Sequence, residues 1–299
     1  SDTMDRRALP VTNPHNVSVF LSATFRGEKG RAELVLRLIK ASTKEILWTS
    51  KEFDMNEEDQ AFAASHAAEQ ILDCLVRISP TQRQTSLLPW AVMSGLFSLD
   101  PNTIVGTEEQ LSLVSPDDEE GIVQPLQVFA QIFRENEGLA KHQEIDTDWL
   151  VKVSNQVSQS SRLQALSESL LGYSAHMLAN NRELGSLLVE QSFLRAPYLI
   201  LNLDHLTVVR LSKGDVAGAA TTLQKLLKVS KLSPWRYSFE VTGAMVSLAR
   251  GDTKSSLAYA NSALIRKPKF IGALRYAMVS CALAGNTKDA HRMKVRIRQ

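Results

Sequence analysis

Apolar and polar side chains alternate along residues 17–26 and again along residues 31–41. Alternation with a period of two is typical of a strand that buries one face. The segment at residues 27–30, "GEKG", joins the two runs, and its glycines tolerate the positive φ that a tight turn needs. A third run at residues 45–53 contains Ile46, Trp48 and Phe53. Together these runs predict a three-stranded antiparallel meander.

The period changes to that of a helix over residues 56–78. Asn56 suits the N-cap position, acidic residues fill the first turn, and side chains from Phe62 to Leu75 recur at helical spacing. Because a sheet with one apolar face needs a cover, we expect this helix to lie on the meander.

The strand pattern ends at Pro80, and helical patterns follow. Residues 85–101 predict a helix that ends at its final proline, and residues 102–121 predict a loose connection with one short helix. The acidic run at 117–120 favours the start of the next helix over a cation site. We therefore expect an irregular helical linker region over residues 81–164.

Four segments in the second half of the chain share one frame. They are LANNRELG from residue 178, LSKGDVAG from 211, LARGDTKS from 248 and LAGNTKDA from 283, and their first leucines lie 33, 37 and 35 residues apart. This spacing brackets a 34-residue helix–turn–helix unit. Each segment places Gly or Asn where a first helix must end, since that position usually needs positive φ. Asp215 and Asp252 then suit the N-cap of the second helix.

Further positions of this frame make residues 165–299 resemble tetratricopeptide repeats. The small residues of the pattern are matched by Ala219, Ser256, Ala263 and Ala290, and the prolines that follow the second helices are Pro197, Pro234 and Pro268. Leu226 departs from the pattern, and Pro234 comes later than the pattern requires. The resemblance implies a superhelix whose concave face holds proteins or peptides.

The N-terminal run "VFLSATFRGEKGRAELVLRLIKASTKEILWTSKEFDM" resembles the second half of a TolB-amino-terminal-like α/β domain. The matching positions are Leu36, Leu38, Glu45, Ile46, Leu47, Trp48 and Phe53. In that family the domain commonly precedes tetratricopeptide repeats. The pair resembles the C-terminal region of bacterial winged-helix transcriptional regulators and of class III adenylate cyclases. Neither output domain is present in this sequence, and we expect the chain to be a piece of a longer protein.

The predicted fold class is therefore an α+β N-terminal piece, a three-stranded antiparallel meander plus a helix, followed by an all-α tetratricopeptide-like superhelix. The predicted domains are a small TolB-like α/β domain at 1–80, the linker region at 81–164 and the repeats at 165–299.

Composition adds little to this picture. The formal net charge is only +2, so no overall electrostatic attraction to nucleic acid or an anionic membrane is expected, and nucleic acid would be bound only through a domain absent from this chain. The basic tail "HRMKVRIRQ" fits cations at a helix C-terminus. Cys74 and Cys281 fit buried thiols in a reducing compartment. No run approaches the length of a membrane span, so we expect a cytoplasmic protein, or a periplasmic one if an anchor precedes the segment.

Motifs for catalysis, cofactors or metals are not found. The six histidines show no HxxxH or HExxH spacing, and the chain has no GxSxG elbow and no Walker-type phosphate loop. The glycines of "RGEKG" join two strands and open no helix, which argues against phosphate binding. We expect a protein that is not an enzyme and needs no cofactor or metal.

The favoured function is a regulatory and protein-interaction module of a bacterial signalling protein, the sensor or effector part of a transcriptional regulator. It would bind a protein or peptide partner or a second copy of itself. The first helices of the repeats offer a candidate partner-binding face with a basic lean, suited to an acidic or C-terminal carboxylate segment. Its residues are Asn202, His205, Arg210, Arg236, Glu240, Arg275 and Tyr276.

Two alternatives remain at this point. One is the accessory region of a class III adenylate cyclase. The other is a small-molecule sensor with its pocket between sheet and helices, where Trp48, Phe62 and Trp90 would meet.

The repeat frame yields a prediction at Ala263. Replacing it with Leu should destabilise the last two repeats by about 1–3 kcal/mol, because small residues at this position let adjacent helices approach closely. Urea unfolding followed by circular dichroism measures the change. A fully stable, monomeric Ala263→Leu variant would show that the register is wrong.

Overall fold

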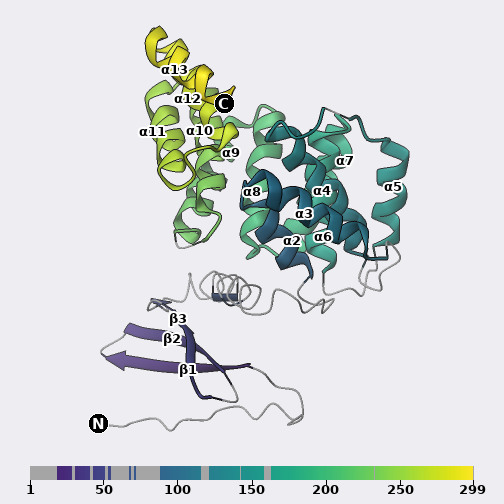
Figure 1. Ribbon diagram of the computed structural model, residues 1–299, viewed down its shortest axis with the longest axis vertical. Helices are drawn as coiled ribbons and strands as arrows, with labels where there is room; N and C mark the ends of the chain where they lie inside the picture. The colour runs from purple at the N-terminus through teal and green to yellow at the C-terminus, as the bar shows by residue number, and fades with distance from the viewer. Residues whose placement is uncertain are drawn as a thin grey trace. The chain divides into compact units, whose positions relative to one another are not determined.

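The computed structural model describes most of the chain, in two compact units that span residues 1–82 and 83–299 (Figure 1). The described residues are 19–28, 31–40, 43–50, 53–54, 67–68, 71, 88–115, 121–141, 143–157, 163–231 and 233–298. The first unit contains an antiparallel sheet and helical residues, and the second unit is all-α. The predicted order, an α+β piece followed by an all-α part, is confirmed.

The sheet of the first unit is built around its second strand. The strands are β1 (Val19–Glu28), β2 (Arg31–Lys40), β3 (Ile46–Thr49) and β4 (Phe53–Asp54). β1 pairs antiparallel with β2 in one unbroken register. β3 and β4 both pair antiparallel with β2, so they form the predicted third strand in two pieces. At Ser50, between these pieces, the Leu36 amide donates to the Ser50 hydroxyl over 2.9 Å.

Helical residues of the first unit pack against one part of this sheet. Ala67, Ala68 and Ile71 are helical, and Ala67 is buried against Leu36, with Ile71 and Trp48 packed around them. The remainder of the predicted helix at 56–78, with Phe62, His66 and Cys74, lies outside the described residues.

Twelve helices are described in the second unit. They are α2 (Leu88–Leu96), α3 (Pro101–Ser112), α4 (Val123–Asn136), α5 (Thr147–Gln156), α6 (Gln164–Met177), α7 (Arg182–Arg195), α8 (Ile200–Ser212), α9 (Val216–Val229), α10 (Arg236–Ala249), α11 (Thr253–Arg266), α12 (Ile271–Leu283) and α13 (Thr287–Ile297). From α6 onward they pack as successive helix pairs, which is the arrangement of a helical repeat. None of the described helices has the length and apolarity required to cross a bilayer.

The turn inside each helix pair has the backbone that the repeated segments predict. A residue with positive φ follows each first helix, with φ of 49° at Asn180, 80° at Gly214, 75° at Gly251 and 76° at Gly285. The residue directly after it then caps the second helix through its side chain. The caps are Asn181, Asp215, Asp252 and Asn286, each accepting from a backbone N–H three residues later. The predicted caps Asp215 and Asp252 are therefore confirmed.

The region expected to be an irregular linker contributes helices to the second unit. α2 packs against α3 and α4, and α4 packs against α6. The predicted helix over 85–101 was too long, because α2 ends at Leu96 and Asp100 caps a new helix by accepting from the Thr103 amide over 2.9 Å. The expected short helix is α3, which has 12 residues.

Two glycines allow α6 and α7 to approach at backbone distance. A Cβ built on Gly172 would lie 2.9 Å from the Gly185 carbonyl oxygen, and one built on Gly185 would lie 2.8 Å from the Gly172 carbonyl oxygen. Neither neighbour is a side chain that can rotate away. Later in the repeat, small residues have the same role: Ala263 and Ser256 are fully buried, and Ser280 of α12 donates to the Ser256 hydroxyl over 2.8 Å.

This packing predicts opposite effects for one substitution at two helical glycines. Gly172→Ala should lower the free energy of unfolding by about 1–3 kcal/mol, because the added methyl group meets a backbone oxygen. Gly106→Ala in α3 is the control, since a Cβ there meets nothing within 4 Å. It should raise stability by up to about 1 kcal/mol through helix propensity alone. Urea titration followed by helical circular dichroism tests both. Equal effects at the two sites would contradict the close approach.

Candidate functional site

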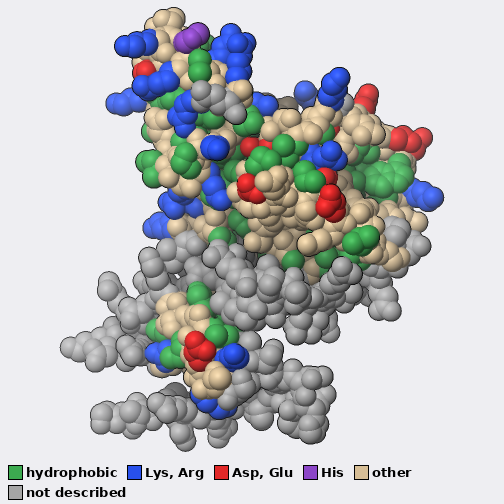
Figure 2. All heavy atoms as spheres, viewed as in Figure 1, with side chains coloured by type: hydrophobic (Ala, Val, Ile, Leu, Met, Phe, Trp, Pro, Cys, Tyr) green, Lys and Arg blue, Asp and Glu red, His purple; other side chains and the backbone are tan. Residues whose placement is uncertain are grey.

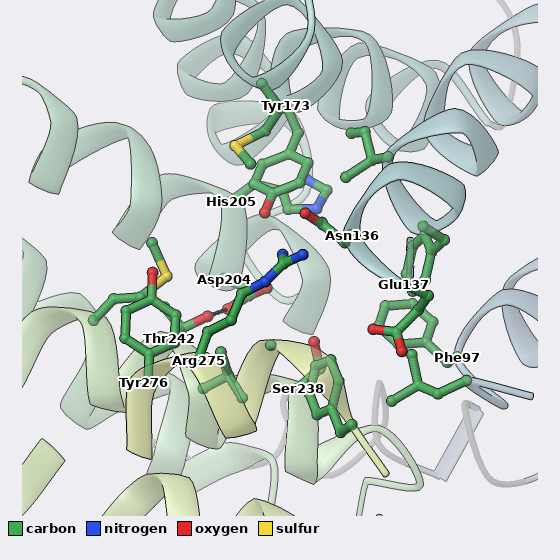
Figure 3. Close-up of a pocket in the computed structure, with 18 of the residues that line it drawn as sticks. Phe97, Asn136, Glu137, Tyr173, Asp204, His205, Ser238, Thr242, Arg275 and Tyr276 are labelled. Carbon is green, nitrogen blue, oxygen red and sulfur yellow. Dashed lines mark hydrogen bonds between the residues drawn. The ribbon is translucent and has the colours of Figure 1, made fainter. Parts of the chain in front are cut away.

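A cavity of about 380 Å³ lies on the inner face of the helical repeat (Figure 3). The first helix of every pair contributes to its lining, since residues of α6, α8, α10 and α12 all face it, and α4 supplies a further wall. A hydrogen bond of 2.8 Å from the Lys267 ammonium to the Ser98 carbonyl joins the segment after α2 to the turn before α12. The cavity thus lies between elements that are far apart in the sequence.

Aromatic side chains form much of the cavity wall. Phe97 lies edge-on to Phe133 with ring centroids 5.0 Å apart, and Phe129 lies edge-on to Phe133 at 5.3 Å. The Phe97 ring also stacks on the Trp235 ring, with ring centroids 4.8 Å apart. Interlocked rings of this kind hold a fixed shape and offer an apolar surface to a bound molecule.

His205 is held in a neutral form at the α8 side of the cavity. It is 1% exposed, its Nδ1 lies 2.8 Å from the Ser169 hydroxyl, and its ring stacks on Tyr173 at 4.2 Å. Burial lowers the pKa of His205 to about 3, although a hydrogen bond with the Ser169 backbone opposes this. The ring therefore carries no charge near neutral pH.

Asp204 precedes His205 in the sequence, and its carboxyl group accepts a hydrogen bond from a hydroxyl group. The Thr242 hydroxyl donates to its Oδ1 over 2.6 Å, and this bond links α10 to α8 (Figure 3). Burial raises the pKa of Asp204 to about 6, while the bond from Thr242 opposes the rise.

Glu137 and Arg275 supply the remaining charges of the cavity. Glu137 follows α4, is 9% exposed, and its Oε1 is buried without a hydrogen-bond partner. Burial raises the pKa of Glu137 to about 7, opposed by a bond from the Ile271 backbone amide and by the charge of Arg275. Arg275 is exposed, and no ion pair to it occurs among the described residues. Both side chains extend toward the same space, Glu137 from the end of α4 and Arg275 from α12 (Figure 3).

Three of the seven residues predicted to form a partner-binding face line this cavity. They are His205, Arg275 and Tyr276. The prediction grouped these residues because of their positions along the first helices, and in the structure they line the same cavity.

The other four predicted residues make contacts within the scaffold. Asn202 is fully buried and donates to the Ser192 and Ala196 carbonyls over 3.1 and 3.0 Å. Arg210 donates to the Thr222 hydroxyl of α9 over 2.6 Å. Arg236 donates to Glu240, whose carboxylate also lies 3.7 Å from Arg266. These polar groups are used to hold successive helices together, which register alone could not distinguish from an exposed face.

The sequence prediction missed Tyr173, Asp204, Asn136 and Glu137 as cavity residues. Asp204 carries a signal, because it is a charged residue within the apolar run of α8. Asn136 and Glu137 carry none, because they precede the repeats and nothing in their spacing relates them to α12.

The structure also places two of the aromatic residues of the predicted small-molecule pocket. Trp90 stacks on Trp235 within the second unit, with ring centroids 6.2 Å apart, whereas Phe62 lies outside the described residues. Cys281 is a buried free thiol.

In the part of the chain that the structure describes, no group of three His, Cys, Asp or Glu side chains is placed to hold a metal ion. Lys and Arg side chains gather over the end of the unit that carries α11–α13 (Figure 2).

Comparison with known proteins adds no assignment. None of the protein-family models matches this chain, and no curated protein gives a significant match. The site must therefore be interpreted from its own geometry.

The raised pKa of Asp204 predicts how stability depends on pH. Between pH 3.8 and about 6 the folded protein keeps the proton that the unfolded chain loses, so this group's contribution to stability falls as pH rises through that window. Asp204→Asn removes the penalty and should stabilise the protein by about 1–3 kcal/mol at pH 7.5, with little change at pH 3.5.

Urea unfolding at the two pH values measures this difference. Glu109→Gln, which removes an exposed carboxyl group, is the control and should leave stability nearly unchanged at both. A destabilised Asp204→Asn variant at pH 7.5 would show that the ionised form is needed by the fold.

Proposed function

We propose that this chain is a non-catalytic regulatory module whose second unit recognises a ligand in the cavity on its inner face. In this proposal it is the sensor part of a bacterial signalling protein, and the second unit is a tetratricopeptide-like superhelix. The DNA-binding output domain would lie elsewhere in the parent protein, as the resemblance to winged-helix regulators implies.

The cavity is the observation that carries this proposal. Its volume of about 380 Å³ lies within the range of small-molecule sites, and such sites combine apolar walls with a few polar groups. Aromatic rings supply the walls, and Glu137, Arg275 and Asn136 supply the polar groups. This favours a small molecule over a large protein surface as the first ligand.

The hydrogen bonding of the other polar groups supports binding rather than catalysis. His205 is engaged by Ser169 and Asp204 by Thr242, so each holds one helix against another. A general base must reach the proton that it removes, and these two groups already have partners within the scaffold.

The composition of the lining suggests how binding is transmitted. One ligand would contact α4 and the first helix of all four pairs, so it would favour one arrangement of these helices over others. Neighbouring pairs of a solenoid contact each other directly, so a change in curvature reaches both ends of the array.

A variant that fills the cavity tests this function. Ser238→Trp on α10 places an indole in the cavity, whereas Gln224→Trp places the same group on an exposed position of α9. The measurement is the set of transcripts that depend on the parent gene, in a deletion strain complemented with each full-length version.

We expect Ser238→Trp to lose the response of these transcripts and Gln224→Trp to keep it, with thermal unfolding confirming that both variants fold. Ser238→Leu, a smaller group, gives the same test if the indole prevents folding. An unchanged response in the folded Ser238 variants would refute the proposed function.

A further inference from the structure

Five of the polar groups that line the cavity fall into two sets. Asp204, Thr242 and His205 have hydrogen-bond partners within the protein. Glu137 keeps one buried oxygen with no partner, and Arg275 has no ion pair among the described residues. An unpartnered buried carboxylate oxygen costs free energy, so it marks a place where a bound donor would be stabilised.

Glu137 and Arg275 are near each other without touching. The guanidinium is close enough to lower the pKa of the Glu137 carboxyl group, yet no ion pair within 4.0 Å joins them. Opposite charges that face one space across a gap suit a molecule with both charges of its own. Its cationic group would meet Glu137, and its anionic group would meet Arg275.

The rest of the cavity specifies the body of that molecule. Phe97, Phe129 and Phe133 form an apolar wall in edge-on contact, a geometry into which another aromatic ring fits well. Asn136 lies on the same side as Glu137, and its amide can donate or accept (Figure 3).

We infer that the cavity binds a free amino acid with an aromatic side chain, whose ammonium group pairs with Glu137 and whose carboxylate pairs with Arg275. This inference rests on the proposed function and adds to it the chemical class of the ligand. A simple amine would leave the guanidinium facing a second cation, and a simple carboxylate would leave the Glu137 oxygen without a donor. Only a zwitterion satisfies both groups.

Calorimetric titration of the full chain at pH 7.5 with four related probes tests the inference. L-Phenylalanine carries both charges, 2-phenylethylamine lacks the carboxylate, and 3-phenylpropanoate lacks the amine. N-Acetyl-L-phenylalanine imitates the last residue of a peptide. We expect L-phenylalanine to bind about 10- to 100-fold more tightly than each of the other three, since each lacks one charge-assisted contact.

Two variants assign the contacts. Glu137→Gln should weaken L-phenylalanine about 10-fold or more and leave 3-phenylpropanoate unchanged. Arg275→Gln should weaken L-phenylalanine similarly and leave 2-phenylethylamine unchanged. Lys294→Gln, which removes an exposed cation from α13, is the matched control and should change nothing.

Several results would overturn the inference. Equal binding of 2-phenylethylamine would indicate a site for cations, and equal binding of N-acetyl-L-phenylalanine would indicate a site for peptide C-termini. No measurable binding of any probe at 5 mM would exclude the class. If no probe binds while Ser238→Trp still abolishes the transcript response, the proposed function stands and the ligand class fails. If L-phenylalanine binds as expected while that response is unchanged, the ligand class stands and the regulatory role fails.

Discussion

The second unit depends on the close approach of its helices, which in turn depends on residues with no side chain or a small one. Gly172 and Gly185 bring two backbones together where any Cβ would meet a carbonyl oxygen. Ala263 and Ser256 have the same role in the later pairs, where both are fully buried. Helices this close cannot shift independently, and the first helices consequently hold a common inner face.

That inner face acquires a cavity because the chain folds back upon it. α4 packs against α6, and the bond between Lys267 and Ser98 joins this early region to the last two pairs. The enclosure buries Asp204, His205 and Glu137, whereas Arg275 stays exposed. Burial raises the pKa of Asp204 and Glu137 and lowers that of His205, because each shift favours the neutral form of the group. Because of the same desolvation, an interaction with a bound group of opposite charge is stronger there than at the surface.

Much of the local structure could be predicted because it depends on neighbours in the sequence. Positive φ at Gly214, Gly251 and Gly285 follows from the need to reverse the chain within three residues, and the caps at Asp215 and Asp252 follow from the unpaired N–H groups of the next turn. The meander could be predicted for the same reason, since alternating apolar and polar side chains indicate a strand with one buried face. The break in the third strand at Ser50 could not be predicted, because it involves a contact with another strand: the Ser50 hydroxyl accepts a hydrogen bond from the Leu36 amide of β2.

By itself the sequence determined the order of the units, the positions of the turns and which residues allow helices to pack closely, because these are encoded in short-range periodicity and backbone preference. Only the tertiary structure decided which polar residues face one another. It placed Glu137 beside Arg275 although they are 138 positions apart, and it used Arg210 and Arg236 to hold helices together. The physical reason is that a partner for a charged group is chosen by three-dimensional proximity, and residues of one helix face give no information about the element that covers it.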